Sequence, residues 1–98
     1  MKQLSEELKF NGYTYKLIKR NDFKALYEQH SKRSGLIAYE LFYIPKHNGF
    51  NIGETTINPT EYFPKDEYFG KFAWTLKVDL EYALQRYEQL PKINLLKS

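Results

Sequence analysis

The stretch Leu36-Ile37-Ala38-Tyr39-Glu40-Leu41-Phe42-Tyr43-Ile44 (LIAYELFYI) decides the fold. It is apolar or aromatic throughout except at Glu40, which is typical of a central β-strand. Because side chains alternate along a strand, one face carries Ile37, Tyr39, Leu41 and Tyr43, and the other carries Leu36, Ala38, Glu40, Phe42 and Ile44. Pro45 lacks the N–H that a ladder needs, so the strand is predicted to end there.

Further strands are predicted on either side of this one. Asn11-Gly12 lies between two aromatic residues, which is a strong hairpin signal. Residues 13–20 and 23–29 alternate as strands do, with Tyr13, Tyr15 and Leu17 on one face of the first. A second Asn-Gly pair at 48–49 precedes a weaker strand over 50–57, which Gly53 interrupts. These segments predict an antiparallel meander of four to five strands.

The hydrophobic period changes to that of a helix near residue 69. Apolar residues at helical spacing are Phe69, Phe72, Ala73, Leu76, Leu80, Ala83, Leu84, Tyr87 and Leu90. The pattern predicts a helix over 69–90, capped by Asp66 or a neighbour and ended by Pro91. Residues 58–63 have the order of a short helical turn, which Pro64 would end. The predicted class is α+β: the meander with one long C-terminal helix packed on one face.

Composition indicates one domain over residues 1–98, with looser ends at 1–6 and 92–98. There is no cysteine, so a disulfide scaffold is excluded. The start of the chain does not resemble a signal peptide, and no apolar run is long enough to span a bilayer. We therefore expect a cytoplasmic protein that is not in a membrane.

The sequence shows no pattern that is typical of an enzyme. Only two histidines are present, no glycine loop could hold a phosphate, and no nucleophile or acid/base pair is evident. We therefore expect a non-catalytic protein without metal or cofactor. Glu40 is the one chemically unusual residue: it would have a raised pKa if buried, or it would pair with Lys16 or Lys24 across strands if its face were open.

One candidate partner surface is the sheet face turned away from the helix. We expect the helix to cover Tyr13, Tyr15 and Leu17 together with Ile37, Tyr39, Leu41 and Tyr43. The opposite face would then present Lys16, Ile18, Arg20, Glu40, Phe42 and Ile44. An exposed apolar patch inside a basic rim is typical of a partner surface. Alternatively, the N-terminal segment or a second copy of the chain would cover it.

A second candidate surface is the back of the predicted helix, where Trp74, Val78 and Tyr82 follow at steps of four. Such a row is either another packed face or an anchor for a partner, including a homodimer. For Trp74 the aromatic stretch at 61–68 favours a lid, in which Tyr62, Phe63 or Tyr68 would cover the indole.

Function is predicted only as a class. We expect binding of a protein partner, and the chain's size is also typical of accessory or inhibitor proteins of phages and mobile elements. The alternative is single-stranded nucleic-acid binding, because residues 1–49 carry nine Lys/Arg against five Asp/Glu. Lys19, Lys24, Lys32 and Arg33, with Lys16 and Arg20, would then contact phosphates while Tyr or Phe rings stack on bases.

Overall fold

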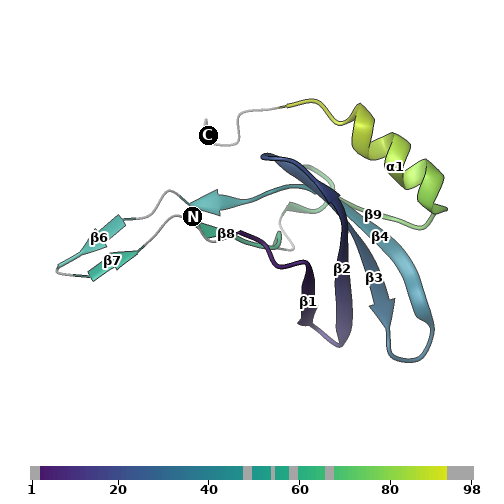
Figure 1. Cartoon of the computed structure of the whole chain (residues 1–98), viewed down its shortest axis with the longest axis horizontal. Helices are drawn as coiled ribbons and strands as arrows, with labels where there is room; N and C mark the ends of the chain where they lie inside the picture. The colour runs from purple at the N-terminus through teal and green to yellow at the C-terminus, as the bar shows by residue number, and fades with distance from the viewer. Residues whose placement is uncertain (1–2, 48–49, 54, 58–59, 66–67, 93–98) are drawn as a thin grey trace.

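The structure, a computed structural model, describes residues 3–47, 50–53, 55–57, 60–65 and 68–92. Five antiparallel strands form the main sheet in the order β1-β2-β3-β4-β9. They are β1 (Glu7–Phe10), β2 (Tyr13–Arg20), β3 (Lys24–Ser31), β4 (Gly35–Tyr43) and β9 (Ala73–Leu76). Helix α1 (Leu80–Gln89) packs on one face of this sheet (Figure 1). The predicted α+β class, with an antiparallel meander and a C-terminal helix on one face, is confirmed.

The first hairpin forms where the Asn-Gly pair predicts it. Asn11 and Gly12 have φ values of 53° and 82°, and Phe10 pairs with Tyr13 across the turn. A left-handed conformation at both central residues matches the twist of the flanking strands, and glycine adopts it without a steric penalty. The second Asn-Gly pair, at 48–49, lies outside the described residues.

The sheet separates two hydrophobic clusters, one on each face. On the helix side, Leu26, Tyr39, Leu41 and Leu76 pack with Ala83 and Tyr87 of α1. On the other side, Tyr15, Ala25, Tyr27, Phe42, Ile44 and Ala73 form a second buried cluster. The segment after β8 covers that cluster, and the ring centroid of Phe63 lies 4.7 Å from that of Tyr15 and 4.9 Å from that of Phe42. From Ala38 onward the predicted alternation of β4 therefore holds and both faces of the strand are buried, whereas Leu36 and Ile37 are exposed and a register shift makes Ile37 an extra residue.

A bulge in β2 places Arg20 on the face opposite Lys16 and Ile18, with which it was predicted to lie. Leu17 pairs with Tyr27 and Lys19 with Leu26, so Ile18 is the extra residue. Two residues of β2 therefore oppose Leu26, and Ile18 packs in the helix-side cluster. Tyr13, Tyr15 and Leu17 lie on the opposite face, so the prediction that α1 covers them is wrong. Cross-strand register, which alternation within one strand does not fix, decides the face.

The C-terminal helix is shorter than predicted. It has ten residues, and Ala73–Leu76 is the fifth strand of the sheet, paired with β4 from Tyr39 to Phe42. Gly70, at a φ of 89°, turns the chain just before that strand. Asp79 is the N-cap and accepts a hydrogen bond from the Tyr82 N–H at 2.8 Å. The proposed cap, Asp66, lies outside the described residues, and the helix ends before Pro91 as predicted.

The segment between β4 and β9 also differs from the prediction. Strands β6 (Phe50–Ile52) and β7 (Thr55–Ile57) pair with each other in a separate two-stranded sheet that extends away from the main one (Figure 1). They are therefore not the fifth strand of the meander. Thr60–Glu61 is strand β8, paired with β5 (Lys46–His47), so the described part of 58–63 is extended and not helical.

Candidate functional site

The predicted open sheet face does not exist as one surface. Lys16 and Ile18 lie on the helix side, whereas Arg20, Glu40, Phe42 and Ile44 belong to the other side. Phe42 is fully buried and Ile44 is 1% exposed. The expectation of an exposed apolar patch is therefore wrong, because Phe63, Tyr68 and Phe69 cover it together with the N-terminal residues Leu4 and Leu8. The N-terminal segment, which was the predicted alternative, therefore covers part of this face.

Arg20 is held in an internal ion pair. Its guanidinium donates to both carboxylate oxygens of Glu61, at 2.6 Å and 2.8 Å, and Glu61 is buried. The Leu4 N–H donates to the same carboxylate at 3.1 Å. The hydrogen bonds from Arg20 are the main reason that the pKa of Glu61 is lowered. The pair links β2, β8 and the N-terminal segment, and the 41 positions between its members explain why local spacing did not reveal it.

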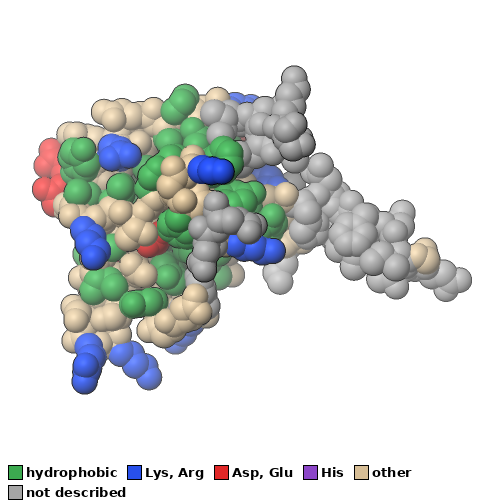
Figure 2. All heavy atoms as spheres, turned by 180° about the vertical axis from the view of Figure 1, so that it is seen from behind, with side chains coloured by type: hydrophobic (Ala, Val, Ile, Leu, Met, Phe, Trp, Pro, Cys, Tyr) green, Lys and Arg blue, Asp and Glu red, His purple; other side chains and the backbone are tan. Residues whose placement is uncertain are grey.

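Three of the six cations proposed for nucleic-acid binding, Lys19, Arg20 and Lys24, have partners within the fold. Lys24 is buried, and its ammonium donates to the backbone oxygens of Tyr87 and Leu90 at 2.5 Å and 3.0 Å. Lys19 pairs with Glu88. Lys16, Lys32 and Arg33 are exposed. On the face shown in Figure 2, Lys and Arg side chains are scattered and form no continuous stripe.

Glu40 lies in the middle of the covered sheet face. It is 3% exposed and sits between Tyr27 of β3 and Thr75 of β9. The Thr75 hydroxyl, 2.9 Å and 3.1 Å from the two carboxylate oxygens, donates to this group. The expected pairing with Lys16 or Lys24 is wrong, because the register places those residues opposite other positions.

A cavity of about 270 Å³ opens beside this carboxylate. It is lined by Asn11, Tyr15, Gln29, Glu40, Phe63, Pro64, Phe69 and Thr75. The Gln29 amide donates to the Tyr15 hydroxyl at 3.1 Å. Asn11 and Thr75 are exposed, so they mark the entrance, whereas Glu40 and Pro64 are buried. Below, this space is called the Glu40 cavity.

Burial governs the electrostatics of the Glu40 cavity. It raises the pKa of Glu40 to about 7, and the hydrogen bond from Thr75 only partly opposes this shift. Burial also raises the pKa of Tyr15, and it raises that of neighbouring Tyr27 to about 12, so both phenols are neutral near pH 7. Glu40 is therefore the group of this cavity that changes charge near neutrality. It can accept hydrogen bonds or exchange a proton.

The exposed hydrophobic side chains gather elsewhere. Among the described residues, those that are large and exposed are Leu36, Ile37, Val78, Leu80 and Tyr82. Figure 1 shows the start of β4 and the β9–α1 connection at the same end of the molecule. The β4–β9 ladder ends at the Tyr39–Leu76 pair, and Ile37 and Val78 each lie two residues beyond it. These five residues are called the end surface.

The row Trp74, Val78 and Tyr82 is not on one helix. Trp74 belongs to β9, Val78 precedes α1, and Tyr82 alone lies on the helix. Trp74 is half-buried in the helix-side cluster, with its ring 6.2 Å from that of Tyr43. Phe63 and Tyr68 pack in the other cluster, so neither of them is a lid over Trp74, and Phe63 instead covers Tyr15 and Phe42.

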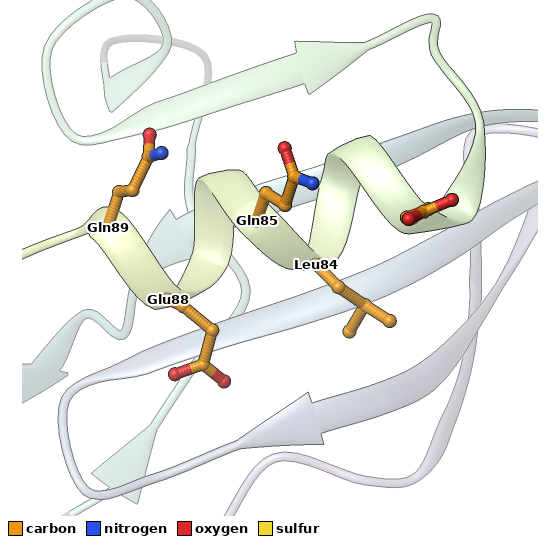
Figure 3. Close-up of a pocket in the computed structure, with 5 residues that line it drawn as sticks. Leu84, Gln85, Glu88 and Gln89 are labelled. Carbon is orange, nitrogen blue, oxygen red and sulfur yellow. The ribbon is translucent and has the colours of Figure 1, made fainter.

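The outer side of α1 bears a shallow hollow of about 440 Å³ (Figure 3). Leu84 and Glu88 point to one side of the helix and Gln85 and Gln89 to the other. One helix provides all of its lining, including Glu81, so it lacks a second wall among the described residues.

The described part of the chain contains neither a metal-binding cluster nor a membrane-spanning helix. No group of three or more His, Asp or Glu there could hold a metal ion. No helix there has the length and apolar character needed to cross a membrane.

Comparison of the chain with family models, with curated proteins and with solved structures finds no match.

Proposed function

We propose that this chain is a small non-catalytic protein that binds another cytoplasmic protein through the end surface. The proposal rests on the exposed apolar residues of two segments, 36–37 and 78–82, which are distant in the sequence but lie at the same end of the sheet. Single exposed hydrophobic residues are ordinary, but a group of this kind favours a partner. Tyr82, at 46% exposure, has the side-chain type that is enriched at the centres of interfaces.

The charges support a protein partner over nucleic acid. Lys24 caps a helix, Arg20 pairs with Glu61 and Lys19 pairs with Glu88, so these cations already have partners inside the fold. A nucleic-acid site would need a basic stripe that tracks the phosphates. On the face seen in Figure 2, the Lys and Arg side chains are scattered and form no such stripe.

A non-catalytic role is supported by the chemistry of the Glu40 cavity. Acid/base catalysis commonly uses two groups with separated pKa values. Of the residues that line this cavity, Glu40 titrates near neutrality, whereas burial raises the pKa of Tyr15 further above its ordinary value.

The experiment compares the wild-type chain with a Val78→Ser/Tyr82→Ser variant as bait for proteins of its own host. Both side chains are exposed, so the variant should fold with a change in unfolding free energy of about 0.5 kcal/mol or less. We expect a protein that the wild type retains at high salt and the variant does not, because apolar contacts are little screened. Lys16→Ser, on an exposed residue outside the end surface, is the matched control.

Retention of the same proteins by wild type and double variant would contradict the proposal. Recovery of nuclease-sensitive material that high salt releases would favour nucleic acid instead. Sedimentation of the isolated chain over a range of concentrations tests whether the partner is a second copy: self-association that the double variant abolishes would identify a homodimer.

A further inference from the structure

A buried carboxylate without an opposite charge needs an explanation. Removing a charge from water carries a large free-energy penalty, which proteins usually offset with an ion pair or several hydrogen bonds. Glu61 follows this rule, with Arg20 and the Leu4 N–H as donors. Glu40 is less exposed than Glu61, at 3% against 5%, and has the Thr75 hydroxyl as its side-chain donor.

Among the described residues, those that line the cavity supply no positive charge. Strand β2 contributes Tyr15, β3 contributes Gln29 and β9 contributes Thr75, and Tyr27 of β3 lies beside Glu40 in the ladder. The covering segment contributes Phe63, Pro64 and Phe69. Tyr15 and Tyr27 are the titratable neighbours, and both stay neutral near pH 7 because burial raises their pKa values.

The remaining acceptor capacity of Glu40 is directional. A hydroxyl has one proton, so Thr75 can fully satisfy at most one of the two oxygens at a time. The other lone pairs of the carboxylate are left for donors in the cavity. Two parallel N–H groups on a planar cation match a carboxylate in a bidentate pair, which is the strongest common arrangement for this group.

The walls and the volume restrict the body of such a ligand. Phe63 and Phe69 offer phenyl rings, against which a planar cation or an aromatic ring packs favourably. The volume of about 270 Å³ falls just below the roughly 300–1,000 Å³ of ordinary ligand pockets. A small molecule therefore fits, whereas a nucleotide or a folded segment does not.

We propose that the Glu40 cavity binds a small organic cation of the amidinium or guanidinium class, with its N–H donors on the Glu40 carboxylate and its apolar body against Phe63 and Phe69. The site is separate from the end surface, so the two proposals succeed or fail independently. Neutral amides of the same shape lack the charge and the second parallel donor, and they should bind much more weakly.

The test uses benzamidine as the probe and benzamide as its neutral counterpart, titrated at pH 8 into the ¹⁵N-labelled chain. We expect benzamidine to bind in the millimolar range or tighter, with amide shifts centred on Gln29, Glu40 and Thr75. Glu40→Gln and the change to benzamide should each weaken binding by about tenfold or more. Lowering the pH to 6 should weaken it by about tenfold, because Glu40 is then mostly protonated.

Glu7→Gln, which alters an exposed carboxylate outside the cavity, is the control and should leave the affinity within about twofold. The fold of Glu40→Gln is checked by the dispersion of its amide spectrum, so that lost binding is not confused with unfolding. Three results would each overturn the proposal: no amide shifts at about 10 mM benzamidine, equal binding by benzamide, or equal binding by Glu40→Gln.

Discussion

At the scale of single residues, Glu40 is expected to lower stability at neutral pH. Below pH 4.5 its carboxyl is protonated in both the unfolded and the folded chain. Between pH 4.5 and about 7 the unfolded chain releases the proton while the folded protein keeps it, so the stabilising effect of the proton is lost as pH rises. Above about pH 7 the loss is complete and amounts to about 3 kcal/mol.

Glu40→Gln should therefore raise the free energy of unfolding at pH 8, by up to about 3 kcal/mol, because the amide is uncharged at every pH. Urea unfolding at pH 5 and pH 8 measures this difference, and the variant should show a smaller change between the two values than the wild type. Glu7→Gln is the exposed control. A variant that is less stable than the wild type at pH 8 would show that the charged carboxylate has a partner in the fold.

Lys24 makes the opposite kind of contribution, because its buried ammonium joins β3 to the C-terminal end of α1. Lys24→Met should lower the free energy of unfolding by about 1–3 kcal/mol, since the carbonyl oxygens of Tyr87 and Leu90 lose a charged donor. Lys16→Met, at an exposed position of β2, should change it by about 0.5 kcal/mol or less. Equal effects of the two substitutions would contradict the capping role.

Sequence reasoning could recognise Glu40 as unusual but could not determine its environment. A carboxylate within LIAYELFYI is unexpected whether or not its face is covered. Its burial depends on Phe63, Pro64 and Phe69, which arrive from a segment more than twenty positions later. The roles of Lys24 and Arg20 were hidden for the same reason, because their partners are 63 and 41 positions away.

At the scale of elements, the Arg20–Glu61 pair is expected to hold the N-terminal segment on the sheet. The pKa of Glu61 is lowered, so its contribution is present above its ordinary pKa and is lost as pH falls through the lowered value. Arg20→Met should destabilise the protein by about 2–3 kcal/mol, because it leaves a buried carboxylate without its cation. It should also speed hydrogen exchange at Leu4, whose N–H donates to Glu61.

Arg33→Met, at an exposed position in the turn between β3 and β4, is the matched control and should leave both quantities near their wild-type values. Faster exchange throughout the sheet, and not mainly at the N-terminal segment, would show that Arg20 supports the whole core and not one element.

The types of secondary-structure elements were predicted well where the local residues have strong conformational preferences. Asn11-Gly12 requires positive φ and forms its hairpin, and the nine-residue apolar run forms the central strand. The apolar spacing at 69–76 suited a helix equally well, but pairing with β4 made that segment a strand. Asp79, a good N-cap, marks the actual start of the helix.

At the scale of the whole molecule, the order of the layers could be predicted from the sequence. The segment that packs on the second face of the sheet could not. The helix lies on the Tyr39/Leu41 face as expected from a two-layer α+β domain. The second cover is the irregular segment around Phe63, which has no periodicity that would predict where it packs. Together with the bulge at Ile18, this cover explains why the residues of the predicted partner surface are divided between two faces and why Phe42 and Ile44 are buried.

The same organisation predicts that the β6–β7 hairpin is separable from the folded body. Its two strands pair with each other and extend away from the main sheet (Figure 1). Replacing residues 50–57 with a short Gly-Ser linker should therefore change the free energy of unfolding by about 1 kcal/mol or less, since loop-closure entropy varies slowly with length. Urea unfolding of the wild type and the shortened chain measures this change.

A matched replacement of residues 73–76, which form the fifth strand beside β4, should prevent stable folding. If removing the hairpin unfolds the protein as well, the hairpin is part of the cooperative core, and the core must extend beyond the two clusters that flank the main sheet.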